Sequence, residues 1–326
     1  MKAIKFFAIT AMAAAMITSC STDDELSQSN YTSDNIIRVT AGVNNAKTRA
    51  EGQGTEMDKD FSLTIVNKNA PKYTYTDNVF SKKSGDWACS ETLLWQKSDA
   101  LVDIVAFAPA QTGKFNGVYA DGSIQPITYS VADDQSTKSD NNDLLYYYAK
   151  DFNPGTSLDK GKLNIQFNHA FCMIDINVTL GTEFNKPSIP TTSPIIKVTL
   201  GGTKIAANVN VTNAASVVTA SGEATATDIT TTNGSFTTAA DPEKNAISRF
   251  SCIAIPQTVG ANTFKVSLMT AGKRYEWTSA EPVELKSGYR YTLKLSMGND
   301  VVLLKGGGIT ATPWTEITSD KPLETD

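Results

Sequence analysis

The chain has 326 residues, of which 40% are hydrophobic and 9% aromatic, so it holds enough apolar side chains for folded domains and is not a wholly disordered protein. Its formal net charge is −5, and an acidic chain without a basic cluster repels phosphate backbones. The composition therefore argues against nucleic acid as a partner, and the length favours two domains.

The first residues have the pattern of a secretory signal peptide. Residues 1–19 begin with Lys2 and Lys5, and continue as an apolar, alanine-rich run that is too short to span a membrane. An aliphatic residue and two small ones then precede Cys20, which predicts a lipid on this cysteine and stable anchoring in a membrane. The acids that follow resemble a surface-export signal, and this resemblance implies the outer membrane. In the alternative interpretation, cleavage is ordinary and Cys20 is incidental.

The segment 20–49 is predicted to be a propeptide with a removable strand. An acidic linker is followed by a run rich in β-branched residues, and the segment ends at the isolated basic bond between Arg49 and Ala50. We interpret this order as an anchor, a strand and a cut site. The strand residues that we expect to be removed are Ile36, Ile37, Val39, Ala41 and Val43.

The remainder of the chain has the pattern of an all-β protein. Apolar residues alternate with polar ones over 61–65, and the nearly continuous apolar run 101–108 is typical of a strand buried on both faces. Between Ala170 and Ile174 the alternation changes phase, which indicates a bulge or a strand that passes between two environments. We place a domain junction near this point and predict β-sandwich domains over 50–180 and 181–326.

The last apolar segments, 301–304 and 309–314, flank three consecutive glycines. An end segment of this kind is able to leave its own domain and to fill a groove in a neighbouring subunit, which would build an open fibre. The candidate donor residues are Val301, Leu303, Ile309 and Trp314. The alternative is that both terminal segments are ordinary strands of a monomeric sandwich, because periodicity alone does not separate the two cases.

No residue pattern indicates an enzyme, a cofactor or a metal site. His169 is the sole histidine and lies in a strand pattern between Phe167 and Phe171, so we expect it to be a packed or hydrogen-bonded structural residue. With Cys20 lipidated, three cysteines remain, without the spacing of a metal framework; they allow at most one disulfide, and buried thiols are the favoured interpretation for Cys172 and Cys252.

The chain resembles the fimbrillin family of type V pilins from Gram-negative anaerobes. The resemblance rests on the lipobox, the strand before Thr48-Arg49-Ala50, and an ordered set of later motifs: Trp95, Val105 to Pro109, Asp143 to Tyr146, Phe167 to Phe171, Gly288 to Leu293, and Ile309 with Trp314. It implies two transthyretin-like β-sandwich domains in tandem, export as a lipoprotein, cleavage after Arg49 by a trypsin-like, Arg-specific protease, and polymerisation with other pilin subunits by strand exchange. Cys172-Met173 departs from the small and basic pair that the family often carries there.

The function that these features indicate is that of a pilus subunit, or of an accessory tip or anchor protein, located in a fimbrium at the cell surface. The alternative is a monomeric surface lipoprotein that binds a glycan or a host protein through the loops of a β-sandwich. Exposed aromatic loops around Trp87 or Trp95 would favour this second interpretation.

Overall fold

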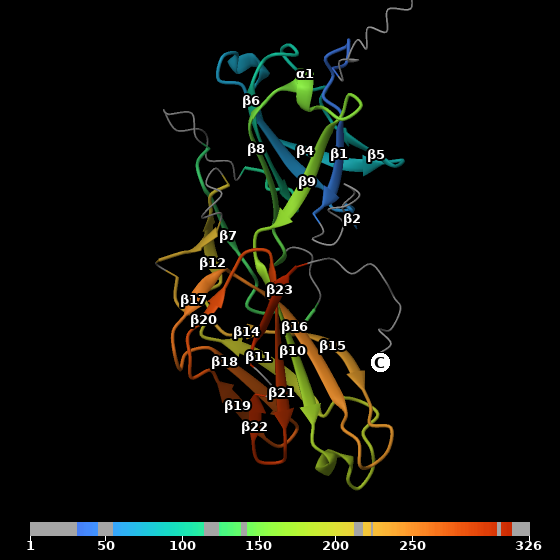
Figure 1. Cartoon of the computed structure of the whole chain (residues 1–326), viewed down its shortest axis with the longest axis vertical. Helices are drawn as coiled ribbons and strands as arrows, with labels where there is room; N and C mark the ends of the chain where they lie inside the picture. Colours follow the sequence, from blue (N-terminus) through green and yellow to red (C-terminus); the bar gives the residue numbers. More distant parts are fainter. Residues whose placement is uncertain are drawn as a thin grey trace, which may run out of the picture.

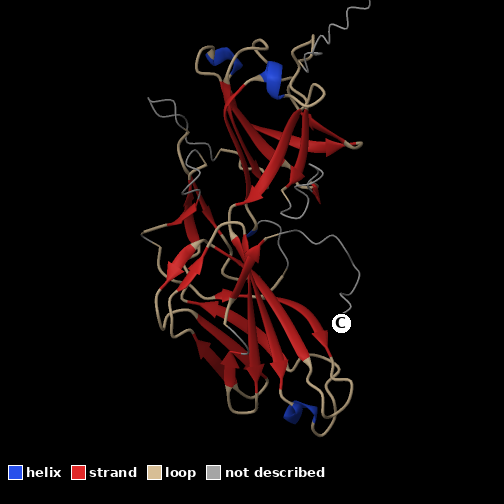
Figure 2. Cartoon of the chain, viewed as in Figure 1, coloured by secondary structure: helices blue, strands red, loops and turns tan. Residues whose placement is uncertain are grey.

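The computed structural model describes residues 31–44, 55–113, 124–137, 142–211, 218–222, 224–304 and 308–314. The described chain is nearly all β, as the alternating patterns predicted (Figure 2). Helical turns in it are short: the 3-10 helices η1 (Pro71–Tyr73) and η3 (Thr182–Asn185), and the single turn α1 (Pro154–Ser157).

The first half of the chain builds one strongly curled sheet (Figure 1). Its strand order is β2-β1-β9-β8-β6-β3-β4-β5, and β1 contacts β5 although the two strands lie near opposite ends of that order. The sheet therefore wraps around its own core. The strands are β1 (Val39–Val43), β2 (Thr55–Glu56), β3 (Phe61–Val66), β4 (Tyr75–Lys83), β5 (Asp86–Cys89), β6 (Val102–Ala108), β8 (Leu145–Phe152) and β9 (Leu163–His169).

The centre of this sheet is formed by β3 and β6, in which every residue is buried. Burial on both faces was predicted for the apolar run in β6 and is confirmed. In β3 the polar positions are buried as well, because the Ser62 hydroxyl accepts a hydrogen bond from the Gln111 amide and the Thr64 hydroxyl accepts one from the Asp77 amide. The alternation in β3 is thus one of polarity and not of exposure.

Two further sheets share the second core. The six-stranded sheet runs β15-β16-β10-β21-β22, with β23 also paired to β21, and the four-stranded sheet runs β14-β11-β18-β19. Residues of both sheets belong to one cluster of buried side chains, so their inner faces pack together. The strands are β10 (Cys172–Leu180), β11 (Ile195–Gly201), β14 (Ile229–Thr230), β15 (Thr232–Thr237), β16 (Ile247–Ala254), β18 (Lys265–Thr270), β19 (Arg274–Thr278), β21 (Tyr289–Met297), β22 (Val302–Leu304) and β23 (Thr310–Pro313).

Two small sheets complete the second core. In one of them β7 (Ile127–Ser130) pairs with β12 (Ala206–Val209), which also pairs with β13 (Val218–Ala220). In the other β17 (Gln257–Val259) pairs with β20 (Val283–Leu285). Because Ile124, Ile127 and Val131 are buried in the second core, a segment from the first half of the chain packs with strands from the second half. The division into domains at residue 180 stays a prediction.

The change of phase near residue 170 is the crossing between the two cores. β9 ends at His169 and β10 begins at Cys172, with Ala170 and Phe171 fully buried between them. The inward side chains of β9 belong to the first core, whereas those of β10 belong to the second. The Ser287 hydroxyl donates to the Ala170 carbonyl and the Gly288 amide donates to the Phe171 carbonyl, so the loop before β21 is fastened to this crossing.

Candidate assembly site

The segment upstream of Arg49 forms an integral strand of the first sheet. β1 runs parallel to β9 through five residue pairs, from Val39 with Leu163 to Val43 with Phe167. Its other side is covered at Gly42 and Val43 by the short strand β2. The Asn44 amide extends the ladder by donating to the Phe167 carbonyl at 2.7 Å.

Side chains of this segment alternate between the core and the surface. Ile37, Val39 and Val43 are buried in the first core, and Ala41 packs against it half-buried. Thr40 is exposed on the opposite face. Of the five strand residues named from the sequence, Ile36 and Ile37 precede β1, and Ile36 makes an isolated bridge with Leu94.

The start of the segment is fastened by backbone hydrogen bonds to the loop that follows β5. The Ile37 amide donates to the Leu93 carbonyl at 2.9 Å, and the Trp95 amide donates to the Asn35 carbonyl at 2.8 Å. On the surface, the Arg38 guanidinium pairs with Asp34 and holds the pKa of that carboxyl below its usual range. The pairing with residues 93–95 could not be predicted from local patterns, because it joins segments that are distant in the chain.

β9 depends on β1 for most of its backbone pairing. Within the described residues, the ladder between β9 and β8 consists of two pairs, Leu145 with His169 and Tyr146 with Asn168. Over Leu163–Phe167 the paired neighbour is therefore β1. Taking β1 away would leave an unpaired strand edge above the buried side chains of Leu163, Ile165 and Phe167.

The C-terminal segment is an interrupted edge strand of the six-stranded sheet. β22 pairs with the end of β21 and β23 pairs with its beginning, both antiparallel (Figure 1). Val302 is buried, but Val301 and Leu303 are 49% and 58% exposed, and all of β23 is exposed. An apolar groove of about 530 Å³ lies beside Leu304 and Ile309, so the strand is incompletely packed along its length.

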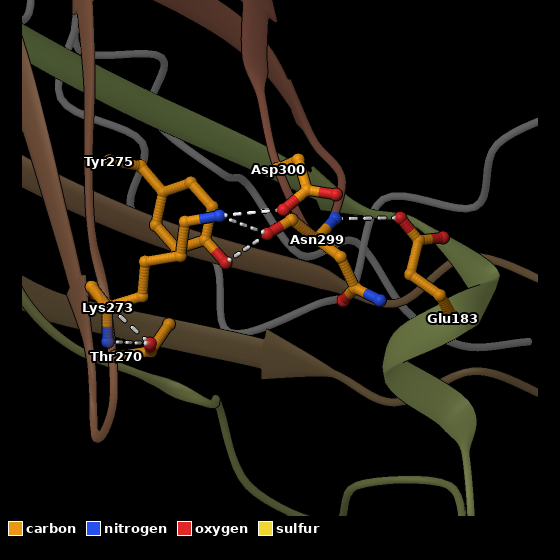
Figure 3. Close-up of polar contacts among 6 residues, drawn as sticks. All are labelled: Glu183, Thr270, Lys273, Tyr275, Asn299 and Asp300. Carbon is orange, nitrogen blue, oxygen red and sulfur yellow. Dashed lines mark hydrogen bonds and ion pairs between the residues drawn. The ribbon is translucent and has the colours of Figure 1, made fainter.

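The base of this segment is held by a polar cluster around the turn between β21 and β22 (Figure 3). The Asn299 carbonyl accepts hydrogen bonds from the Tyr275 hydroxyl and the Lys273 ammonium, both at 2.8 Å. The Asn299 amide donates to the Glu183 carboxylate at 3.0 Å, and Lys273 also pairs with Asp300 at 2.9 Å. The turn is thereby joined to the β18–β19 hairpin and to η3.

The tip of the segment is held by Trp314, which is 8% exposed. Its ring stacks on that of His169 with centroids 3.7 Å apart and planes within 10°, and its amide donates to the Gly288 carbonyl at 2.7 Å. The buried His169 ring lies 3.0 Å from the Asp143 carboxylate through Nδ1. The prediction that His169 is packed and hydrogen-bonded is confirmed; its contact with Trp314 was not foreseen.

The remaining residues singled out in the sequence are packed or lie outside the described residues. Trp95 is buried and stacks on Phe152, and Trp87 is half-buried against Phe61, so neither forms an exposed aromatic platform. The thiols of Cys172 and Cys252 are free and buried, and burial raises the pKa of both. Cys20, Arg49, Ala50 and the signal segment 1–19 lie outside the described residues.

A family model described as fimbrillin-like matches residues 48–314. The chain belongs to the fimbrillin-like family. This membership makes it a fimbrial or cell-adhesion protein of the cell surface, as the resemblance implied. A comparison with curated protein sequences gives no match. No helix in the described part of the fimbrillin-like chain is long and apolar enough to cross a membrane.

Solved structures from Bacteroides share this fold. A proposed cell adhesion protein from Bacteroides ovatus has a TM-score of 0.61 at 15% identity, covering 86% of this chain and 98% of that one. A proposed cell adhesion protein from Bacteroides uniformis has a TM-score of 0.55 at 15% identity, with coverage of 87% and 100%. A fimbrial protein from Bacteroides vulgatus also has a TM-score of 0.55 at 15% identity, with coverage of 86% and 99%.

Proposed function

We propose that the protein is a pilus subunit, or an accessory tip or anchor protein, that assembles with other pilin subunits by strand exchange. In this proposal, lipid on Cys20 holds the exported chain at the outer membrane. An Arg-specific, trypsin-like protease then cuts between Arg49 and Ala50 and frees the propeptide that contains β1. A strand from the C-terminal end of a neighbouring subunit takes the place of β1 beside β9.

The acceptor half of the proposal is supported by the burial of β1. Three of its segment's side chains, those of Ile37, Val39 and Val43, are buried, and each fully buried aliphatic side chain contributes about 1.5–3 kcal/mol. Their sum is an upper bound, because unfolded chains already bury part of this surface. An incoming strand would regain this burial and the backbone hydrogen bonds of the β9 edge.

The donor half is supported by apolar side chains that the monomer leaves in water. Val301 and Leu303 project from an edge strand and are about half exposed, while Val302 between them is buried in the strand's own sheet. A strand with apolar residues on both faces is suited to packing in a second environment. Donor and acceptor lie at different places on one subunit, so the contact is heterologous and builds an open fibre.

The test is processing and assembly at the cell surface. Material sheared from cells carrying the wild-type gene should begin at Ala50 and give a ladder on unheated gels, whereas Arg49→Ala should leave uncut, lipid-bearing monomer. Lys47→Ala, which removes a nearby basic residue, is the matched control and should behave as wild type. A wild-type protein that stays monomeric after complete cleavage at Arg49 would refute strand exchange and favour a monomeric lipoprotein that binds glycan or host protein through its loops.

A further inference from the structure

The propeptide strand and the tip of the C-terminal segment both contact one structural element, β9. Residues 163–167 of β9 pair with β1, and the ring of His169, at the end of β9, stacks on the ring of Trp314. Asn168 alone therefore separates the acceptor edge from the contact that holds the tip of the candidate donor strand. This arrangement places the two functional ends of the chain within reach of one another.

Beyond its base, the C-terminal strand pairs with β21 and is held at its tip by Trp314. All four residues of β23 are exposed, so they contribute backbone pairing to β21 but little burial. Trp314 supplies the buried side chain, the aromatic stack and the hydrogen bond to Gly288. Aromatic pairs add stabilisation beyond the area that they bury, so loss of this stack would let the strand peel from its tip.

The position of His169 is fixed by the neighbours that the structure gives it. Asp143 holds the ring, Leu145 of β8 pairs with the backbone, and the Ser287 hydroxyl donates to the His169 carbonyl. Two residues earlier, the Phe167 carbonyl accepts a hydrogen bond from the Asn44 amide, and the Asn44 side chain donates to the Asn168 side chain at 2.9 Å. Both of these bonds belong to the segment upstream of Arg49 and would be lost with it.

We propose that the stack of His169 and Trp314 couples removal of the propeptide strand to release of the C-terminal strand within the same subunit. Loss of β1 and Asn44 leaves β9 without a paired neighbour over 163–167. The backbone that positions His169 then becomes more mobile, and the stack of His169 with Trp314 is weakened. The base stays clamped by Glu183, Lys273 and Tyr275, so the strand swings about the turn at 298–300. This inference rests on the proposed strand exchange and adds an order of events: a subunit becomes a donor after it becomes an acceptor.

The coupling is reciprocal, and this gives the first test. If removal of β1 weakens the binding of the C-terminal strand by some factor, release of the C-terminal strand must weaken the binding of β1 by the same factor. In the uncut Arg49→Ala background, hydrogen exchange of peptides covering 308–314 should rise at least about 10-fold with Trp314→Ala, the factor that corresponds to 1.4 kcal/mol. Exchange over 163–169 should rise with it.

Two variants separate coupling from general damage. Leu303→Ala changes an exposed side chain of the same segment and should leave exchange over 163–169 unchanged. Trp314→Phe keeps an aromatic ring and should restore most of the protection. If Trp314→Ala fails to fold, exchange in Trp314→Phe is compared with that of the unchanged Trp314 protein instead. Faster exchange over 308–314 with unchanged exchange over 163–169 would overturn the coupling.

The second test follows cleavage itself. Wild-type protein is cut at Arg49 with an Arg-specific protease, and the monomer fraction is isolated by size exclusion and compared with uncut Arg49→Ala protein. We expect molecules that have lost protection over 163–167 to have lost it over 308–314 as well. Retained protection over 308–314 in such molecules refutes the coupling, even if polymers form. If both regions lose protection together but no polymer forms, strand exchange is refuted and the coupling stands.

Discussion

The two ends of the described chain are attached to the fold in opposite ways. β1 lies inside a curled sheet, with buried side chains, a five-pair ladder to β9 and extra bonds at Asn35, Ile37 and Asn44. The C-terminal strand lies on an open edge, with exposed side chains along most of its length and firm contacts at its base and tip. Removing a strand packed like β1 exposes buried side chains and breaks a continuous ladder, whereas a strand held mainly at two points can leave by local opening.

The largest effect should come from a charge at the buried side of β1. Val39→Asp places a carboxylate where the side chain is 5% exposed, and a buried charge without a partner costs about 3–5 kcal/mol. We expect a loss of this order in the free energy of unfolding of the uncut protein, measured with denaturant. Thr40→Asp, one residue away on the exposed face, should change it by less than about 0.5 kcal/mol. Equal effects of the two substitutions would contradict the burial of β1.

The same contrast should be smaller within the C-terminal strand. Val302 is 7% exposed and Leu303 is 58% exposed. Val302→Ala removes two methyl groups from a packed position and should cost about 1.5 kcal/mol, since each buried methylene is worth about 0.8 kcal/mol. Leu303→Ala should be nearly neutral for the monomer. Hydrogen exchange over 302–304 measures the difference, and a larger cost for Leu303→Ala would show that the strand faces the other way.

The clamp at the base of the C-terminal strand should contribute about as much as one hydrogen bond. Tyr275→Phe removes the hydroxyl that donates to the Asn299 carbonyl and leaves the ring in the core, so the expected cost is about 1 kcal/mol. Exchange over 298–304 should rise while that over 308–314 changes less. If instead the tip opens first in Tyr275→Phe, the base and tip are not independent attachments.

A dependence of stability on alkaline pH is expected near the crossing. Burial, followed by the charge of Asp143, raises the pKa of Tyr129 from its ordinary value of 10.0 to about 12. Because the folded-state pKa is the higher one, stability is fully present below pH 10 and is lost as the pH rises from 10 through 12. The melting temperature of wild type should therefore fall by about 2 °C more than that of Tyr129→Phe between pH 9 and pH 11. Parallel curves for the two proteins would exclude Tyr129 as the cause.

Local patterns were sufficient to predict the fold class and several of its strands. Continuous apolar character predicted the two-sided burial of β6, and the phase change at 170–174 marked the point where the chain passes between cores. The same patterns did not predict that β7, from the first half of the chain, pairs with β12. Strand pairing between distant segments leaves no signal in the periodicity of either strand.

What the sequence by itself determined is the all-β class, several of the strands and the membership of the fimbrillin-like family, because alternation, β-branched runs and motif order are properties of short segments. Only the tertiary structure decided which strands meet. Thr40 pairs with Asn164, 124 positions later, and Trp314 stacks on His169 at the crossing between the cores. Both contacts join segments that lie far apart in the chain, so they depend on how the strands are arranged in space and leave no mark in either local pattern.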